Sequence, residues 1–469
     1  MARRPRQPDN ARMTYERDAF IAAFAEAGHE LWVVGGALRD QLLGLAGHDE
    51  DFATSATPDE IEALAARLGR AVMTVGKRFG TIGVNLDGRW SEFTTFRGDA
   101  YTEGSRWPEV RFASNIEADL ARRDFTINAL ARNTHTGTVL DPFGGEKDLE
   151  RRLIRAVGEP ERRFREDPLR ILRGLRFASQ LGFDLEGRTF EAMRETAPLI
   201  ASLSQERVTS ELDKLLAGID PARGLELLRE CGALAVALPE LAPMVGCEQN
   251  HWHRFDVWGH TVATVAAIAS DDPDSRRVRR WTALLHDCGK PAVRHIKKDG
   301  EWGFYQHETA GAELAAALLA RLKVAQRDAS TIALLVRRHM DRPNLDDRRS
   351  LRRFMHRCDG HWRDLLALKR ADNVSHTYND DVYHDRLEGL GSAVEEEDAA
   401  LLRAESPLTG DDLIAMFGLP PGRWIGEVKE RLSALVLDGR LKPGDHEAAE
   451  RIARRMLKVA ANEPSASST

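Results

Sequence analysis

The residues best suited to chemistry in this chain are two aspartates, Asp49 and Asp51, which are separated by a single position. If they lie on a strand, side-chain alternation places both carboxylates on one face. Two oxygen ligands so arranged suit Mg²⁺, which proteins usually hold with one or two carboxylates together with substrate phosphates. A bare Asp-x-Asp is more often a polar strand end or turn, so its meaning depends on the motifs around it.

A pair of glycines, Gly35 and Gly36, precedes these aspartates. The apolar run at 31–34 predicts a strand, and residues 37–43 have helical character. A glycine turn ahead of a helix offers free backbone N–H groups that can bind a triphosphate. A nucleotidyl transferase has this layout, with carboxylates that bind a metal ion close to a glycine turn that binds phosphates.

A third carboxylate, Glu92, lies in the segment 90–96, whose alternation predicts another strand. Beside Asp49 and Asp51 it would complete a two-metal site. One metal would lower the pKa of an attacking hydroxyl, and the other would steady the leaving pyrophosphate. Taken alone, Glu92 reads as a surface glutamate.

The sequence Arg122-Arg123-Asp124 offers groups for the rest of a nucleotide. Adjacent guanidinium groups suit phosphate, since each is a fixed fork of donors. The Asp124 carboxylate could accept a hydrogen bond from a ribose hydroxyl.

Asp167 and Arg170 stand three residues apart at the start of a predicted helix over 169–181, so both can lie on one helix face. We expect Pro168 at the first helical position and Asp167 as the cap before it. An acceptor beside a donor can imitate the edge of a base, although such a pair is more often a surface ion pair.

The elements that would position these groups change in kind along the chain. Residues 15–150 alternate strand-like and helix-like runs, with predicted strands at 31–34, 81–86 and 90–96. Helical periodicity dominates from about residue 151, with predicted helices at 169–181, 208–216, 262–269, 310–322 and 365–371. The predicted fold class is α+β, with a small N-terminal α/β head followed by an all-helical neck, body and tail.

The totals are consistent with a soluble protein of several domains. A chain of 469 residues is too long for one core. Its net charge of −7 argues against a generally basic nucleic-acid binder, yet residues 150–176 hold nine arginines against five acidic residues. We expect a disordered basic arm (1–14), the head (15–150), a helical neck that recognises nucleotide and RNA (151–220), a body (221–384), and a helical tail with a disordered C-terminus (385–469).

The compartment follows from what the sequence lacks. Its four cysteines, at 231, 247, 288 and 358, form no C-x-x-C pair, which indicates a reducing compartment. No apolar run is long enough to span a membrane, and the basic N-terminus has no apolar core of a secretory signal. A cytoplasmic location without membrane partners is therefore expected.

Six motifs in a fixed order over roughly residues 30–215 resemble the class II tRNA nucleotidyltransferases, or CCA-adding enzymes, and the related bacterial poly(A) polymerases. They are Gly35-Gly36-x-x-Arg39-Asp40, Asp49-x-Asp51, Glu92-Phe93-Thr94-Thr95-Phe96-Arg97, Arg122-Arg123-Asp124, Glu166-Asp167-x-x-Arg170 and Glu206-Arg207-Val208-x-x-Glu211-Leu212. The resemblance implies addition of CCA to the 3′ end of tRNA, with CTP and ATP as substrates and protein in place of a nucleic-acid template.

The resemblance also implies a role for each motif residue. Asp49 and Asp51 would bind Mg²⁺, with Glu92 as auxiliary carboxylate, and Asp167 and Arg170 would read the incoming base. The implied nucleotide-binding residues are Gly35, Gly36, Arg39, Arg123, Asp124, Asn128, Asp167, Arg170, Arg173 and Arg176, and the residues implied to brace the base-reading helix are Glu206, Arg207 and Glu211.

Within this family the choice lies between full CCA addition, partial CC- or A-addition, and poly(A) synthesis. Residues 75–84 resemble the CCA type, since poly(A) polymerases typically carry a more basic run there. Residues 98–115 resemble the flexible loop that CCA-adding enzymes retain and CC-adding enzymes lack. Both comparisons favour full CCA addition.

A second set of ligands resembles the HD phosphohydrolase domain over about residues 255–375. Its predicted ligands are His260, His286, Asp287 and Asp372, and His307 and His339 add two candidates. Mixed nitrogen and oxygen ligands suit Mn, Ni, Co, Fe or Zn. The resemblance implies either hydrolysis of phosphorylated RNA ends or nucleotides, or only a helical scaffold for tRNA.

Two readings from other classes stay open at this point. One is a phosphohydrolase whose head only binds RNA or nucleotide. The other is a non-catalytic RNA-binding protein, which the complete set of motif carboxylates argues against. The oligomeric state does not follow from the sequence.

Overall fold

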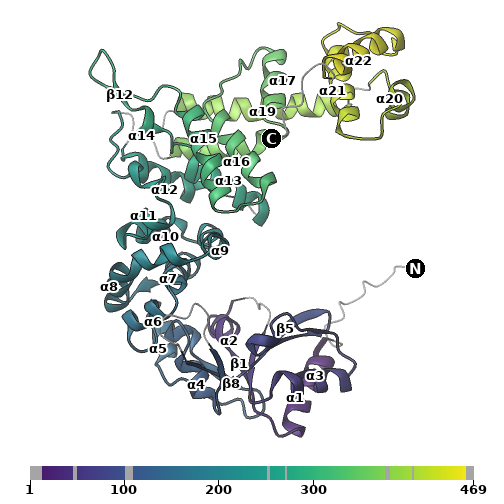
Figure 1. Cartoon of the computed structure of the whole chain (residues 1–469). Helices are drawn as coiled ribbons and strands as arrows, with labels where there is room; N and C mark the ends of the chain where they lie inside the picture. Colours follow the sequence, from purple (N-terminus) through teal and green to yellow (C-terminus); the bar gives the residue numbers. More distant parts are fainter. Residues whose placement is uncertain are drawn as a thin grey trace, which may run out of the picture. The chain divides into compact units, whose positions relative to one another are not determined.

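The computed structural model describes residues 13–45, 50–100, 109–250, 254–269, 272–374, 381–403 and 406–460. The chain divides into two compact units, Met1–Val336 and Arg337–Thr469. The first unit holds a mixed sheet followed by helices, and the second is helical (Figure 1). The predicted α+β class, with an α/β head ahead of a helical remainder, is confirmed.

The head is built on a seven-stranded sheet with the order β3-β4-β5-β2-β1-β8-β9. The predicted bounds of two strands are confirmed, and the third, over Arg89–Thr95, starts and ends one residue earlier than predicted. At the centre, β2 pairs antiparallel with β1 and parallel with β5. The strands are β1 Leu31–Val34, β2 Asp51–Thr54, β3 Val72–Met73, β4 Thr81–Leu86, β5 Arg89–Thr95, β8 Ala131–Asn133 and β9 Val139–Leu140.

Aromatic packing fixes the register of the two central strands. Phe52 of β2 stacks on Phe93 of β5 with ring centroids 4.7 Å apart and planes within 5°. Phe20 and Phe24, from helix α1 (Met13–Glu26), also pack on the Phe93 ring, so α1 covers this face of the sheet. Because strand side chains alternate, the residues beside these phenylalanines face the other side of the sheet.

Small and apolar residues line that other face. Ala53 and Phe96 pack there with Ile116 and Leu120 of helix α4 (Ile116–Ala121).

Helix α3 (Pro58–Arg67) packs on β4 and β5 and also contacts α1. A capping box between Thr57 and Glu60, together with Pro58 at the first helical position, defines the start of α3.

The joint between head and neck corrects one sequence expectation. Helix α7 spans Leu169–Leu181 as predicted, but Pro168 is its N-cap and Asp167 is the extended C-cap of α6 (Pro160–Glu166). Helix α6 ends so close to α7 that Asp167 lies between two helices rather than on one. The Asp167 carboxylate still accepts a hydrogen bond from the Leu169 N–H at 3.2 Å.

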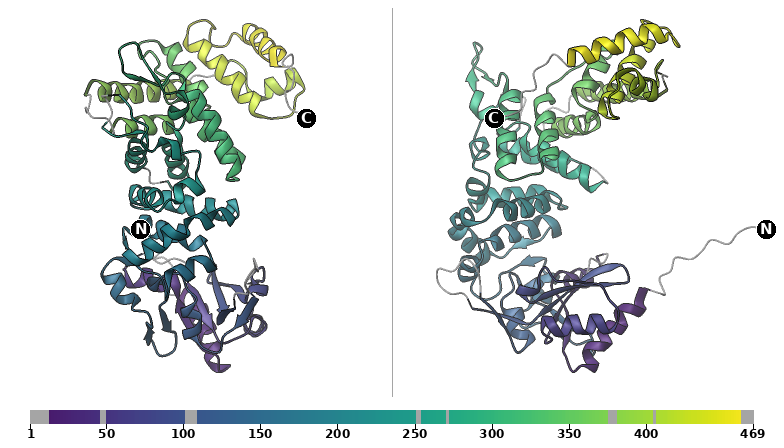
Figure 2. Two further views of the ribbon diagram at one scale, coloured as in Figure 1. Left: turned by 60° about the vertical axis from the view of Figure 1, so that its left-hand side comes forward. Right: turned by 45° about the vertical axis from the view of Figure 1, so that its right-hand side comes forward.

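The helices that follow in the first unit stack on one another above the head (Figure 2, teal). The helix predicted over 262–269 instead spans Val257–Ala267, because Asp256 caps its start by accepting a hydrogen bond from the Gly259 N–H at 2.7 Å. The bounds are α5 Gly145–Glu150, α8 Gly187–Thr196, α9 Gln205–Leu216, α10 Pro221–Glu230, α11 Ala233–Ala237, α12 Val257–Ala267, α13 Pro273–Leu285, α14 Lys290–Val293, α15 His307–Arg321 and α16 Gln326–Arg338.

Short strands lie outside the main sheet. β10 (Leu153–Ile154) pairs with β11 (Asp184–Leu185), and β12 (His295–Ile296) pairs with β13 (Trp302–Gly303). The predicted flexible loop is ordered at its ends, where β6 (Arg97–Ala100) pairs antiparallel with β7 (Glu109–Phe112). Residues 101–108 of that loop lie outside the described residues.

The second unit has two helical parts. Buried Leu413, Val428, Leu432 and Ala449 form a core among the last three helices. Arg352 of α17 pairs with Glu397 of α19 and with Asp438, at 2.6 Å, just after α21. The bounds are α17 Arg348–Arg357, α18 Trp362–Val374, α19 Asp381–Arg403, α20 Gly410–Phe417, α21 Arg423–Leu437 and α22 His446–Ala460.

Over the described residues, every helix is too short or too polar to cross a bilayer. Residues 1–12 and 461–469, where the sequence predicts a basic arm and a disordered C-terminus, lie outside the described part of the chain.

The candidate active site

Two exposed carboxylates meet on the face of the head sheet opposite the phenylalanine core. Asp51 begins β2 and is the Cα partner of Glu92 on β5. Both side chains face away from the phenylalanine core, both are exposed, and neighbouring strands bring them about 4.8 Å apart at the backbone. This oxygen donor set fits a divalent cation. Asp49 lies outside the described residues, so the structure places only one of the two predicted aspartates.

A glycine turn lies beside these carboxylates. Helix α2 (Gly35–Leu42) starts directly where β1 ends, so its first N–H groups are presented at the end of the strand. Gly35 has a φ of +67°, and a Cβ there would lie 2.8 Å from Nη1 of Arg123. The left-handed backbone conformation therefore favours glycine at this position, and the missing side chain leaves room for that guanidinium.

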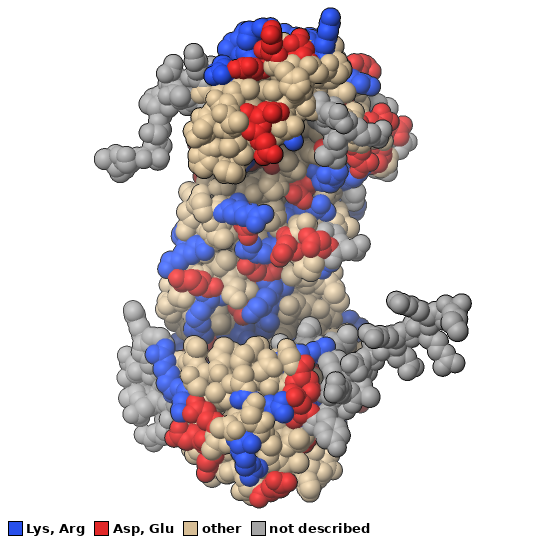
Figure 3. Space-filling view, turned by 90° about the vertical axis from the view of Figure 1, so that its right-hand side faces the viewer, with Lys and Arg blue, Asp and Glu red and all other residues tan. Residues whose placement is uncertain are grey.

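A cavity of about 500 Å³ joins the turn to the neck. Seven arginines and only three carboxylates line it, which makes it a site for an anion. Figure 3 shows this face of the molecule, with basic side chains around the hollow between the head and the helices above it. The lining residues are Gly35, Gly36, Arg39, Asp51, Arg122, Arg123, Asp124, Asn128, Asp167, Leu169, Arg170, Arg173, Arg176, Phe177 and Arg207.

Asp124 is the buried acidic centre of this cavity. It accepts hydrogen bonds from Arg173 at 2.6 Å, from the Asn128 side chain at 3.1 Å, and from the Phe125 N–H at 2.8 Å. Burial alone would raise the pKa of this carboxyl, but the Arg173 charge and these hydrogen bonds hold the pKa well below its ordinary value. Asp124 is therefore ionised and can accept further hydrogen bonds.

Asn128 connects Asp124 to the glycine turn. Its side-chain oxygen accepts a hydrogen bond from Arg39 at 2.9 Å, while Arg39 also binds Asp40 at 2.8 Å. The backbone oxygen of Asn128 accepts from Arg123 at 3.3 Å. Five of the residues predicted to bind nucleotide, Arg39, Arg123, Asp124, Asn128 and Arg173, thus form one connected network.

The two predicted base-reading residues have separate partners. Asp167 pairs with Arg207 at 3.0 Å. Arg170 is buried and donates to Glu166 at 3.1 Å and to the Arg122 carbonyl at 2.8 Å. Both line the cavity, but they do not share a helix face as the spacing suggests, because Asp167 precedes α7.

Two of the three predicted braces reach the base-reading segment. Arg207 binds Asp167, and Glu211 forms a buried ion pair with Arg176 at 2.8 Å. Burial lowers the pKa of the Arg176 guanidinium to about 10, despite the attraction of Glu211. The third brace, Glu206, is exposed and pairs instead with Lys323 at 2.5 Å, just after the end of α15.

Two residues of the site, Asp119 and Phe177, belong to none of the predicted motifs. Asp119 is buried and pairs with Arg122 at 2.8 Å and Arg123 at 3.2 Å, which fixes both guanidinium groups. Its position three and four residues before these arginines is a helical spacing that could have indicated the pairs. Phe177 also lines the cavity, but an apolar residue in a helix gives no signal of such a role.

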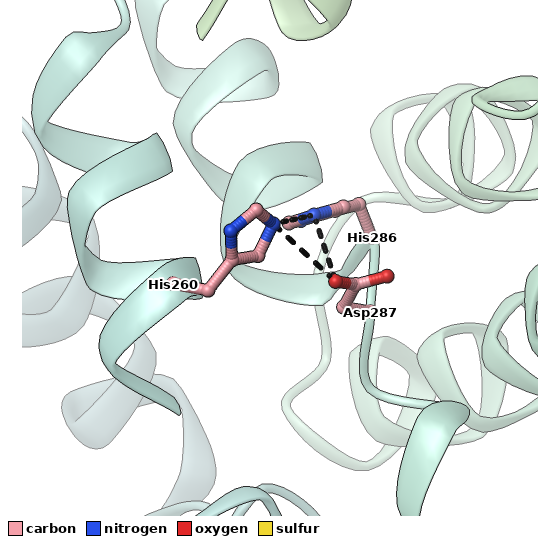
Figure 4. A group of neighbouring side chains, drawn as sticks. All are labelled: His260, His286 and Asp287. Carbon is pink, nitrogen blue, oxygen red and sulfur yellow. Dashed lines mark hydrogen bonds and ion pairs between the residues drawn. The ribbon is translucent and has the colours of Figure 1, made fainter. Parts of the chain in front are cut away.

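A second cluster lies in the body, on α12 and at the end of α13. Figure 4 shows His260, His286 and Asp287 pointing toward one another. Nε2 of His286 is 3.3 Å from Nε2 of His260 and 3.3 Å from the Asp287 carboxylate, and all three residues are buried. Nδ1 of His286 donates to the Ala283 carbonyl at 2.8 Å, so its Nε2 keeps a lone pair for a cation.

Other groups surround this cluster in the first unit. His307 lies 3.5 Å from Asp287, and the Lys290 ammonium lies 2.6 Å from it. The remaining candidates, His339 and Asp372, belong to the second unit, where Asp372 is part of α18 and His339 follows α16.

Comparison with known proteins places these regions in recognised families. Residues 31–155 match the poly A polymerase head domain, residues 182–245 match the probable RNA and SrmB-binding site of polymerase A, and residues 257–375 match the HD domain.

Similar proteins extend over nearly the whole chain. An A-adding tRNA nucleotidyltransferase from Deinococcus radiodurans is 36% identical over 415 residues, which is 86% of this chain and 90% of the relative. A CCA-adding enzyme from Geobacillus stearothermophilus is 34% identical, covering 90% and 92%. A CC-adding tRNA nucleotidyltransferase from Thermus thermophilus is 35% identical, covering 87% and 90%.

Among solved structures, the Bacillus stearothermophilus CCA-adding enzyme in complex with CTP aligns with a TM-score of 0.65 and 29% identity. The alignment covers 97% of this chain and 100% of that one. Fold, domain order and sequence all agree, and the chain therefore belongs to the family of tRNA nucleotidyltransferases that includes the CCA-adding, CC-adding and A-adding enzymes.

Proposed function

We propose that this nucleotidyltransferase builds or repairs the complete CCA end of tRNA from CTP and ATP without a nucleic-acid template. The observation that carries the proposal is the register of Asp51 with Glu92 beside a cavity lined by seven arginines. A carboxylate pair for cations next to a basic cavity is what transfer from a nucleoside triphosphate requires.

In the proposed reaction the 3′-hydroxyl of tRNA attacks the α-phosphate of CTP or ATP. A new P–O bond forms, the bond between the α- and β-phosphates breaks, and pyrophosphate leaves. Mg²⁺ held by Asp49, Asp51 and Glu92 would supply charge neutralisation and a lowered pKa for the attacking hydroxyl. The N–H groups at Gly35 and Gly36 and the arginines of the cavity would bind the phosphates.

The base would be read by the carboxylate of Asp167 and the guanidinium of Arg170. Cytosine and adenine each present an amine donor beside a ring-nitrogen acceptor, which one carboxylate and one guanidinium can satisfy. Uracil and guanine present a carbonyl where the carboxylate needs a donor. An unsatisfied buried group of that kind costs about 1–3 kcal/mol, or one to two decades of selectivity for each contact.

Complete addition is the finer part of the proposal, because relatives with full and partial activities are about equally similar to this chain. Support comes from the CCA-type residues 75–84. It comes also from the retained segment between β5 and α4, which includes the β6–β7 ribbon next to the head sheet.

The test is extension of a tRNA that ends at the discriminator base, with CTP, ATP or both, read at one-nucleotide resolution. Two additions with CTP alone and three with both would establish CCA synthesis. Two additions that never become three would make the protein CC-adding. A long ladder with ATP alone would make it a poly(A) polymerase, and extension only of tRNA already ending in CC would make it A-adding.

We further propose that the body binds a transition metal and hydrolyses phosphorylated RNA ends or nucleotides. The supporting observation is the convergence of buried His260, His286 and Asp287, with the His286 tautomer set by the Ala283 carbonyl. Water bound to a cation there would provide a nucleophile near neutral pH. Asp372 is the proposed fourth ligand.

This second activity is separable from the first. With Mn²⁺, Ni²⁺ or Co²⁺ and a 2′,3′-cyclic nucleotide, release of the monoester should be lost in H286A and D287N and retained in D51N. Nucleotide transfer should show the opposite pattern. Metal content measured after dialysis separates a bound but inactive cation from an absent one. We propose that both activities operate in the cytoplasm, since the four cysteines are free and buried.

A further inference from the structure

One aromatic ring lies beside three of the seven arginines that line the nucleotide cavity. Phe177 of α7 is buried, and its ring centroid is 4.0 Å from the Arg176 guanidinium carbon, 5.0 Å from that of Arg39 and 5.5 Å from that of Arg173. Arg39 comes from the head, while the other two come from the neck. The ring therefore joins guanidinium groups from both parts of the cavity.

These three positive charges lie close together around the ring. Each has one carboxylate neighbour: Asp40 for Arg39, Asp124 for Arg173, and Glu211 for Arg176. The arginines still repel one another, since the charges of Arg173 and Arg39 both act to lower the pKa of Arg176. The electron-rich faces of an aromatic ring attract nearby cations, which a purely aliphatic side chain cannot do.

The ring itself is fixed from behind. Phe125 meets Phe177 edge to face, with centroids 5.9 Å apart and planes at 87°. The Phe125 N–H donates to Asp124, and Phe125 is fully buried. One turn earlier in α7, a Cβ at Gly174 would come within 2.9 Å of the Phe125 ring, so glycine at 174 makes room for this packing.

We propose that Phe177 is a positioning residue for the triphosphate of the incoming nucleotide. It spaces Arg39, Arg173 and Arg176 so that their donors converge on the phosphates, and it acts through these arginines. This inference rests on the proposed function, because the phosphates are those of CTP or ATP. It assigns to an apolar residue of the neck a role in nucleotide affinity.

The deciding variant is F177L, which keeps an apolar side chain of similar size and removes the ring. The Michaelis constants for CTP and ATP should both rise about tenfold, equal to about 1.4 kcal/mol. The turnover number and the Michaelis constant for tRNA should change less than about threefold, because catalytic carboxylates and RNA surfaces are untouched. F177Y, which keeps the ring, should restore the nucleotide constants.

Phe183 provides a matched control. It is a buried phenylalanine just beyond the end of α7, with the Arg152 guanidinium 5.4 Å from its ring, and it is not among the residues lining the cavity. F183L should lower thermal stability as much as F177L does and leave the nucleotide constants at wild-type values. Equal nucleotide effects in F177L and F183L would overturn the proposal, as would wild-type nucleotide constants in folded F177L or failure of F177Y to restore them.

A binding measurement separates this inference from the proposed reaction. Calorimetric titration with inorganic tripolyphosphate reports on the phosphate-binding arginines without any transfer chemistry. Binding that weakens about tenfold in F177L and not in F183L would support the positioning role even if the wild-type protein failed to extend tRNA. Equal binding by wild type and F177L would refute it, whatever the outcome of the extension assay.

Discussion

The carboxylate of Asp167 is held by the guanidinium of Arg207, with Nη2 3.2 Å from one oxygen and 3.0 Å from the other. Arg207 comes from α9 and is half exposed, whereas Asp167 lies between α6 and α7. The group proposed to read the base thus already has a donor on both oxygens. A base that offers an amine can share this carboxylate, while one that offers a carbonyl meets only an acceptor.

Removing this partner should therefore weaken selection more than catalysis. In R207A we expect kcat/KM for CTP and ATP to fall about threefold, while the preference for CTP over UTP falls about tenfold, because each such contact contributes about 1–3 kcal/mol. The measurement is single-nucleotide extension with each triphosphate in turn. R194A, which removes an exposed arginine paired with Glu191 on α8, is the control and should retain wild-type selectivity. Unchanged selectivity in R207A would mean that the ion pair is only structural.

The buried ion pair between Arg176 and Glu211 predicts a separation of stability from activity. Removing one partner leaves an uncompensated buried charge, so E211L should lower the free energy of unfolding by about 3 kcal/mol. The double variant R176M/E211L should recover most of that loss, because packed apolar side chains can replace a buried pair. It should still bind nucleotide poorly, since Arg176 lines the cavity. Urea unfolding and CTP titration of the same samples test both statements, and a double variant less stable than E211L would contradict the first.

Asp124 predicts a pH dependence of stability. Its pKa in the folded chain is depressed by Arg173 and by hydrogen bonds, whereas in the unfolded chain it is near 3.9. The unfolded state therefore binds the proton more readily. The stabilisation by Asp124 is complete above about pH 5 and is lost progressively as the pH falls below that value toward the folded-state pKa.

The variant that tests this has no titrating group at the position. D124N should be less stable than wild type at pH 7, and the difference should shrink between pH 5 and pH 3. D411N, at an exposed carboxylate on α20, should run parallel to wild type over the same range. A constant difference between D124N and wild type across these pH values would show that ionisation of Asp124 does not contribute.

The motifs themselves could be predicted from the sequence because each is local. Strand alternation was sufficient to predict that Glu92 and Asp51 belong on sheet faces, and helical periodicity gave the bounds of α7. The sequence could not show that Asp51 and Glu92 lie opposite each other in neighbouring parallel strands. That register depends on the packing of Phe52 against Phe93, two residues from strands that are not consecutive in the chain. Fold class and family were therefore accessible, while the geometry of the carboxylates was not.

Contacts between distant segments account for the rest. The spacing of Asp167 and Arg170 suggested one helix face, but the break at Pro168 gives each a different partner. The link between Phe177 and Arg39 joins residues 138 positions apart (177 minus 39) and has no motif of its own. Such a role becomes visible only when the head and neck are folded together.

The last prediction concerns Asp51 and Glu92, the two exposed carboxylates on the face of the sheet opposite the phenylalanine core. D51N and E92Q remove one negative charge each from exposed positions, so the fold should be unaffected. If the pair holds the cation, losing several kcal/mol of transition-state stabilisation should slow nucleotide transfer by about three orders of magnitude. D87N is a matched control at the β4–β5 turn of the same sheet, where a φ of +53° suits asparagine equally well. Single-turnover extension with saturating CTP and Mg²⁺ measures the chemical step. Transfer by D51N above about a tenth of the wild-type rate would place the catalytic cation elsewhere, since a carboxylate that binds it cannot be neutralised at so small a cost in rate.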